Sequence, residues 1–271
     1  MTNEFSLAHL TVLGCPPPEM AYIASMTGYD YISIRIIYMG LPGEPNYDLA
    51  SNRMMLKQTK KALSDTGIKV HDIELARIHN EVDVKKYVPA METAAELGAK
   101  SILTSIWTPN REFYIGKYSE LCDLAKPFGL NVDLEFVTWA DVNDLKKAVD
   151  VLKTANRDNC GLMIDTLHFH RSRVQLEELD NLPAKWFHFA HICDGPVQIP
   201  ETKEELIHTG RDARFYPGEC GINIAGILNR LPKMLYSIEL PNLERVKELG
   251  YAEHARRCLQ TTKDYFQKHP K

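Results

Sequence analysis

The sequence has 271 residues with 44% hydrophobic content and a formal net charge of -4 at pH 7. This content suits a folded globular core, and the acidic balance gives no general attraction to nucleic acid or to an anionic membrane. The first residues lack a basic region followed by an apolar run, and no stretch of about 18 apolar residues occurs, so neither a signal peptide nor a membrane span is expected.

Short β-rich runs alternate with longer helical runs along the chain. Strands are predicted at residues 6–12, 31–37, 70–78, 101–107, 131–137, 161–167, 186–192 and 236–240. Several are nearly continuous apolar stretches, which is typical of strands covered on both faces. Helices are predicted at residues 16–28, 50–67, 83–98, 117–129, 140–155, 175–182, 222–231 and 242–269. Gly28 and Gly67 are among the glycines expected to end them, and Thr138 or Asp141 is expected to cap the fifth.

This alternation predicts an α/β protein built as a single (β/α)8 TIM barrel, with residues 1–271 as one domain. An open nucleotide-binding sheet usually carries a glycine-rich loop after its first strand, and the segment Gly14–Glu19 is not one. Two connections are long enough to be functional. Residues 39–51 are expected to act as a lid, and the irregular stretch 194–222 brings two arginines close to the expected barrel mouth.

Four successive strands in the second half each carry a potential metal ligand near the C-terminal end, namely Glu135, Asp165, His191 and Glu239. The ends of consecutive parallel strands converge on one mouth of a barrel. Singly, an ion pair, a turn cap or a hydrogen-bonded core histidine would explain the first three, whereas a buried unpaired Glu239 would be costly. Jointly, they predict a site for one divalent ion, with manganese expected and magnesium, cobalt or zinc as alternatives.

The same segments resemble the xylose isomerase-like barrel superfamily, which includes sugar phosphate isomerases and epimerases, inosose dehydratases and type IV endonucleases. The resemblance covers most of the chain and is carried by residues 134–136, 164–172, 191–194, 211–219 and 238–240. It implies that the four residues above bind one metal and that Glu135 and Glu239 also form the catalytic acid/base pair. It further implies that His168 and Arg214 contact the substrate.

These residue types suit the movement of a proton between the carbons of a hydroxy-ketone. A divalent cation can stabilise the enediolate that forms, and a carboxylate on each face of the substrate can take and return the proton. We therefore expect a metal-dependent isomerase or epimerase acting on a small sugar, sugar phosphate or inositol ketone. A dehydratase of the dehydroshikimate or inosose type is the alternative, because it begins with the same proton abstraction.

Two further functions are less favoured. An abasic-site endonuclease of this superfamily needs extra histidines after the third and fourth strands, where the chain offers only His79, and a histidine where it has Arg214. A non-catalytic polyol-binding protein is disfavoured because no core ligand is lost. Neither a nucleic-acid nor a membrane partner is expected, and a homo-oligomer remains open because barrels of this kind often pair.

Other polar and aromatic residues permit two interpretations each. Arg35 and Glu74 could meet inside the barrel as an ion pair or contact the substrate. His9, Trp107 and Trp139 could line the pocket or pack in the core or rim. The six cysteines are scattered without a Cys-x-x-Cys pair, which is typical of reduced thiols and predicts a cytoplasmic location.

Overall fold

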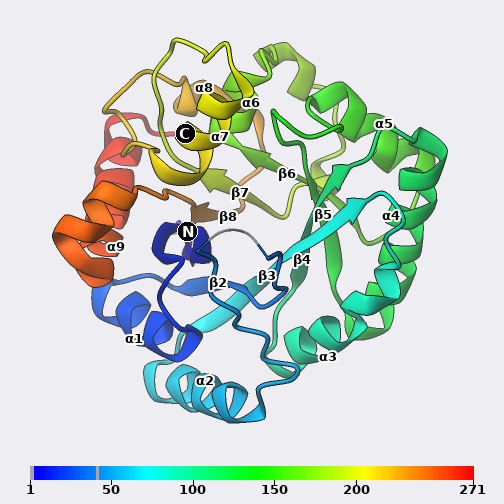
Figure 1. Ribbon diagram of the computed structural model, residues 1–271. Coiled ribbons are helices and arrows are strands. Elements are labelled where there is room, and N and C mark those ends of the chain that lie inside the picture. The colour runs from blue at the N-terminus through cyan, green and yellow to red at the C-terminus, as the bar shows by residue number, and fades with distance from the viewer. Residues whose placement is uncertain (1–2, 41–42) are drawn as a thin grey trace.

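The computed structural model describes residues 3–40 and 43–271. Within them, eight parallel strands pair in chain order and close into a barrel surrounded by helices (Figure 1). The predicted (β/α)8 barrel is therefore confirmed. The strands are β1 (Phe5–Ala8), β2 (Tyr31–Arg35), β3 (Lys69–His79), β4 (Ser101–Trp107), β5 (Asn131–Glu135), β6 (Cys160–Asp165), β7 (Phe189–Ile192) and β8 (Leu235–Ile238).

The described helices lie on the outside of the barrel and at its ends. They are α1 (Pro17–Thr27), α2 (Arg53–Thr66), α3 (Val88–Glu96), α4 (Arg111–Ala125), α5 (Leu145–Ala155), α6 (Thr166–Arg171), α7 (Lys203–Asp212), α8 (Ile224–Arg230) and α9 (Leu243–Lys268). Short 3-10 turns cover His9–Val12, Val84–Tyr87, Lys126–Phe128, Leu176–Leu179 and Ala184–Trp186. None of the helices in the described part of the chain has the length and apolar character needed to cross a membrane.

Local sequence explains most helix ends. Asn52 and Asn110 precede α2 and α4, and each side chain accepts a hydrogen bond from the backbone N–H three residues later. Gly28 and Gly67 follow α1 and α2 with positive φ, a conformation that glycine adopts without steric cost. The predicted glycine stops of these two helices are confirmed.

The predictions differ from the structure in one helix cap and in two short helices. The fifth helix is capped by Asp144, whose side chain accepts from the Lys147 N–H at 2.9 Å, so capping by Thr138 or Asp141 is wrong. The segment 194–222 is not wholly irregular, because it contains α7. A further helix, α6, starts directly after Asp165, where the strand was predicted to continue to residue 167.

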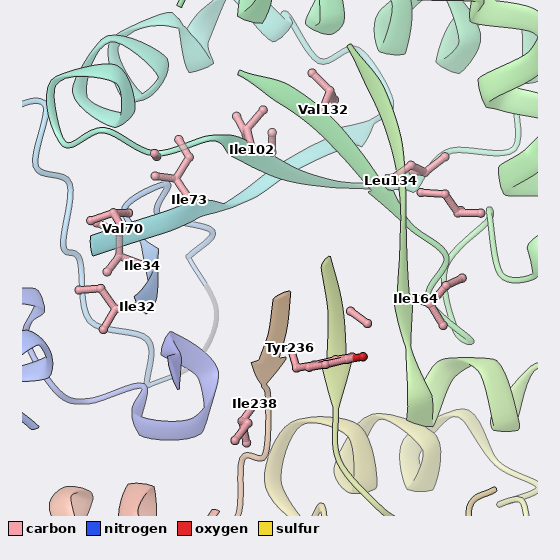
Figure 2. Close-up of a cluster of buried hydrophobic side chains, with 14 of the residues drawn as sticks. Ile32, Ile34, Val70, Ile73, Ile102, Val132, Leu134, Ile164, Tyr236 and Ile238 are labelled. Atoms are coloured by element: carbon pink, nitrogen blue, oxygen red, sulfur yellow. The ribbon is translucent and has the colours of Figure 1, made fainter. Parts of the chain in front are cut away.

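Alternation along the strands sorts the side chains into two environments. Outward residues such as Ile32, Val132 and Ile238 join the large apolar core between the strands and the helices (Figure 2). Inward residues include many polar groups, among them Ser33 and Asp72, whose side chains are joined by a hydrogen bond of 2.5 Å. The barrel interior therefore contains both polar and apolar side chains, and its buried polar groups need hydrogen-bond partners inside the barrel.

One such pair constrains β6. The Asp133 carboxylate is fully buried, and its Oδ1 lies 2.6 Å from Nδ1 of His188. Burial lowers the pKa of His188, but the hydrogen bond to Asp133 more than offsets this and leaves the pKa raised. Gly161 lies beside the pair, so close that a Cβ there would overlap the Asp133 carboxylate and approach His188 Nδ1 at 2.6 Å. Residue 161 is glycine because the pair fills its side-chain space.

We expect Gly161→Ala to lower the free energy of unfolding by about 3 kcal/mol, because the methyl group would separate a buried charged pair. Gly116→Ala is the matched control. Gly116 lies inside α4, and a Cβ added there would meet no atom within 4 Å, so the change should raise stability by up to about 1 kcal/mol. Urea unfolding followed by circular dichroism measures both. Equal midpoints for the two variants would contradict this account of Gly161.

Candidate metal centre

The four predicted ligands lie on one inner face because of strand parity and register. Glu135 ends β5 and Asp165 ends β6, where Asp165 lies level with His191 of β7. His191 pairs with Ser237, so Glu239 follows two residues further on and has the same inward orientation. Adjacent strands of one barrel thus bring residues separated by more than 100 positions in sequence to a common point.

These four side chains form a compact, buried donor set. Each offers one ligand atom, and those atoms lie within 4.8 Å of one another. His191 Nδ1 lies 3.4 Å from Glu239 Oε2 and 3.9 Å from both Glu135 Oε1 and Asp165 Oδ2. Glu135 Oε1 and both ring nitrogens of His191 are buried without a hydrogen bond to any described residue. Buried polar atoms without partners are rare, so this set fits a divalent cation.

Crowding of charge shifts the pKa values of the cluster in different directions. Burial alone would lower the pKa of His191, but Glu239, Glu135 and Asp165 together raise it to about 10. Burial, followed by repulsion from Glu239 and Asp165, raises the pKa of Glu135 well above its usual value. Burial opposes ionisation of Glu239 too, yet His191 and Arg214 hold its pKa below the usual range. The two glutamates therefore have different proton affinities.

Asp165 combines both roles considered for it from the sequence. Its Oδ1 caps α6 by accepting from the N–H groups of Leu167 and His168 at 2.7 and 3.2 Å. Its Oδ2 faces the cluster and accepts from Arg214 Nη1 at 2.6 Å. The helix cap fixes the carboxylate plane and leaves one oxygen directed at the cluster, so the structural role supports the proposed ligand role.

Arg214 is buried against the candidate ligands. Its Nη1 donates to Asp165 and to the Glu239 backbone carbonyl, its Nη2 donates to Glu239 Oε2 at 2.7 Å, and its Nε donates to the Gly210 carbonyl. A guanidinium has five N–H groups, so these contacts leave one on Nη2. The predicted substrate contact by Arg214 remains a prediction, and the structure adds a second role: Arg214 holds two of the candidate-ligand carboxylates, Asp165 and Glu239, in place.

His168 lies beside the cluster as a neutral donor. Burial lowers its pKa to about 4. Its Nδ1 accepts from the Thr138 backbone N–H at 3.3 Å, so the ring proton is on Nε2. The ring packs edge-on against Trp139 with the centroids 4.9 Å apart. His168 is thus oriented to donate one hydrogen bond, which fits the predicted contact with a substrate oxygen.

A cavity of about 450 Å³ adjoins the cluster. Glu135 and Glu239 line it, whereas Asp165 and His191 do not, so the two glutamates face the space that a substrate would occupy. The cavity is also lined by His168, Arg214, Trp107 and Trp139. His9 lies outside this lining and instead accepts from the Arg35 N–H at 2.8 Å and stacks on Tyr47.

The connection after β2 and the Arg35–Glu74 pair were the other features expected at the mouth. Arg35 Nη2 lies 3.0 Å from Glu74 Oε2, so the predicted ion pair forms, and Arg35 also lines the cavity. Met39 and Gly43 from the connection line the cavity too, which is consistent with a lid. Leu41 and Pro42 of that segment lie outside the described residues, and the lid function remains a prediction.

Asp194 is a structural residue that the sequence reasoning missed. It lies two residues after the end of β7, and its two carboxylate oxygens accept from five backbone N–H groups, those of Gly195, Gly218, Cys220, Gly221 and Ile222. This fixes the segment that carries Arg214. An acidic residue at a strand end, followed by a glycine-rich segment, was the signal that could have identified it.

Comparison with known proteins places the chain in a family. A family profile described as xylose isomerase-like TIM barrel matches residues 21–262. The chain belongs to this family. A solved structure of IolI protein with a bound zinc atom superposes with a TM-score of 0.82 and 24% identity, covering 98% of this chain and 99% of that one.

Curated relatives agree with the class predicted from the sequence. The inosose isomerase of Bacillus subtilis (strain 168) is 28% identical over 196 residues, which is 68% of this chain and 67% of that protein. The 3-dehydroshikimate dehydratase of Pseudomonas aeruginosa is 26% identical over 110 residues, 40% of this chain and 17% of that protein. The prediction of an enzyme of the isomerase or epimerase class is confirmed at this level.

Cation uptake by the four side chains is expected to release at least one proton. Because the pKa of His191 is raised to about 10, its ring carries a proton at pH 7 that a cation must displace. The apparent affinity for Mn²⁺ should therefore rise about tenfold per pH unit between pH 6 and 8 for each proton released. Calorimetric titration in buffers of different ionisation enthalpy counts the protons, and a pH-independent affinity would contradict this assignment.

Proposed function

We propose that the protein is a divalent-metal-dependent isomerase or epimerase of a small polyhydroxy-ketone, such as an inosose or a keto-sugar. The observation that carries the proposal is the set of four buried donor side chains within 4.8 Å of one another, two of which also line the adjoining cavity. Manganese is the expected ion. When bound, it would supply Lewis-acid polarisation of a ketone and a neighbouring hydroxyl.

The remaining chemistry falls to side chains of the chain itself. Glu135 and Glu239 come from strands that are not adjacent in the barrel, so a substrate between them would have a carboxylate on each side. One takes the proton from the carbon next to the ketone, and the other returns a proton on the opposite face or at the neighbouring carbon. His168 donates from Nε2 to a substrate oxygen and so stabilises the charge that develops there.

The aromatic walls support a carbohydrate-like ligand. Trp107 and Trp139 line the same cavity as the glutamates and present flat apolar surface. Such surfaces pack against the C–H faces of a sugar or a cyclitol, while the carboxylates and His168 contact its hydroxyl groups. Relatives named as inosose isomerases agree with a cyclic polyhydroxy-ketone as one member of the substrate class.

A dehydratase remains the second candidate. It is favoured by the partial match to a 3-dehydroshikimate dehydratase, and it starts from the same proton abstraction. The outcome differs only in what the carbanion does next, because loss of a β-hydroxyl replaces reprotonation. An ultraviolet-absorbing enone or catechol product, without an epimer, would identify the dehydratase.

We expect Glu135→Gln and Glu239→Gln each to lower turnover of the preferred ketone by about 10³-fold, because an amide cannot exchange the proton. The assay is incubation with Mn²⁺ in deuterated water, with deuterium at the carbon next to the ketone followed by nuclear magnetic resonance. Glu92→Gln, an equal change on the exposed face of α3, should leave the rate unchanged.

Cation titration of the same variants separates the two functions given to each glutamate. A variant that binds Mn²⁺ but exchanges no deuterium has lost proton transfer, whereas one that no longer binds Mn²⁺ has lost a ligand. Near-normal exchange in both Gln variants would refute the acid/base assignment. Failure of the unmodified protein to take up any divalent cation would refute the metal-dependent function itself.

A further inference from the structure

Three arginines from different walls face the cavity that adjoins the metal centre. Arg35 comes from β2, Arg77 from β3 and Arg211 from the last turn of α7. Arg35 is paired with Glu74 at 3.0 Å. Across residues 3–40 and 43–271, no carboxylate lies within 4.0 Å of the Arg77 or Arg211 guanidinium, and neither group donates a hydrogen bond.

The two unpaired guanidiniums are half-buried and close enough to repel. Burial lowers the pKa of Arg211, and the positive charges of Arg35 and Arg77 lower it further. Asp212 and Glu44 act in the opposite direction without overcoming these effects. Partly buried like charges that share one cavity cost free energy, and a bound anion would relieve that cost.

Arg77 is held in a geometry suited to an anion. Its guanidinium lies over the Trp107 ring, with the carbon 5.6 Å from the ring centroid. A guanidinium stacked in this way keeps its N–H edge available, and that edge matches the paired oxygens of a carboxylate or phosphate. Arg77 also lines a second cavity, which shares Met39 and Leu75 with the first and is lined by Lys86 and Asp48, so the charges beyond Arg77 are of both signs.

The metal centre cannot supply the missing negative charge. Its three carboxylates would be balanced by Arg214 together with one divalent cation, and Glu74 is already paired with Arg35. An uncharged polyhydroxy-ketone would therefore leave Arg77 and Arg211 without an ion pair within 4.0 Å among the described residues, with only the more distant Asp212 and Glu44 acting on Arg211.

We propose that Arg77 and Arg211 form an oxyanion subsite that binds a carboxylate or phosphate carried by the substrate, away from the carbons that react between Glu135 and Glu239. The inference rests on the proposed function and narrows its substrate class from polyhydroxy-ketones in general to anionic ones. A keto-aldonate and a ketose phosphate both satisfy it, since each carries a planar or tetrahedral oxyanion at one end of a hydroxylated chain.

Binding of inert polyols tests the subsite without turnover. The probes are a pentitol, its terminal phosphate and the corresponding aldonate, titrated calorimetrically into the Mn²⁺-loaded protein at low ionic strength. We expect at least one charged probe to bind about tenfold or more tightly than the pentitol, and the tighter of the two identifies the oxyanion. Equal affinity for all three probes would overturn the proposal.

Charge-removing variants localise the effect. Arg77→Gln and Arg211→Gln should each reduce the preference for the charged probe about tenfold and leave pentitol binding unchanged, whereas Arg77→Lys and Arg211→Lys should retain part of it. Arg256→Gln removes the same charge from the exposed face of α9 and should change neither affinity. A preference that survives in both Gln variants would overturn the subsite.

The outcomes are separable from those that test the isomerase. Loss of Mn²⁺ binding or of deuterium exchange, with the charged-probe preference intact, would reject the proposed reaction and support the subsite. Rapid exchange on uncharged ketones, without any preference for charged probes, would support the proposed reaction and reject the subsite. Circular dichroism of the five arginine variants verifies that each remains folded.

Discussion

The structure depends on how three buried carboxylates are held around one histidine. Bringing Glu135, Asp165 and Glu239 together away from water is unfavourable unless positive charge is placed among them. Arg214 supplies one such charge through contacts of 2.6 Å to Asp165 and 2.7 Å to Glu239. The three carboxylates also raise the pKa of His191, which shows that they favour a second positive charge at this point. A divalent cation bound among these side chains would supply further positive charge.

The same strand geometry that forms the apolar core also brings these charged side chains together. The cluster exists because strand parity directs each of its side chains inward, and the same parity directs Ile164 and Ile238 outward into the apolar core. A one-residue slip of any of these strands would exchange a core residue for a carboxylate. The apolar packing that stabilises the barrel therefore also specifies which four side chains meet at its mouth.

Sequence reasoning found the features that depend on this parity and missed one helix cap and one short helix. The barrel and the four converging residues follow from short apolar strands that alternate with helices and carry one polar residue near the end. Asp144 was missed as a cap because Thr138 and Asp141 are equally suitable by residue type. The helix α7 did leave a signal, since Thr202 and Glu205 have the spacing of a capping box before the helix.

Other features had no local signature. Arg77 looked like an ordinary strand residue, and only the packing of three walls shows that it shares a cavity with Arg35 and Arg211. Asp165 was weighed as a cap or as a ligand, and the structure shows that one oxygen caps α6 while the other faces the cluster. The helix cap and the contact with the cluster, which the sequence presents as alternatives, are therefore both made by the one side chain of Asp165.

The segment between β7 and β8 completes the site as one packed unit. Asp194 anchors its far end through backbone N–H groups, and Gly210 lies against Trp139 so closely that a Cβ there would overlap the indole ring. The Gly210 carbonyl in turn accepts from Arg214 Nε at 2.7 Å. Because Trp139 also packs on His168, a shift of α7 would disturb the cavity wall, the neutral donor and the charge that holds two ligands. The barrel thus provides the candidate ligands, and this one connection sets the shape and charge of the space above them.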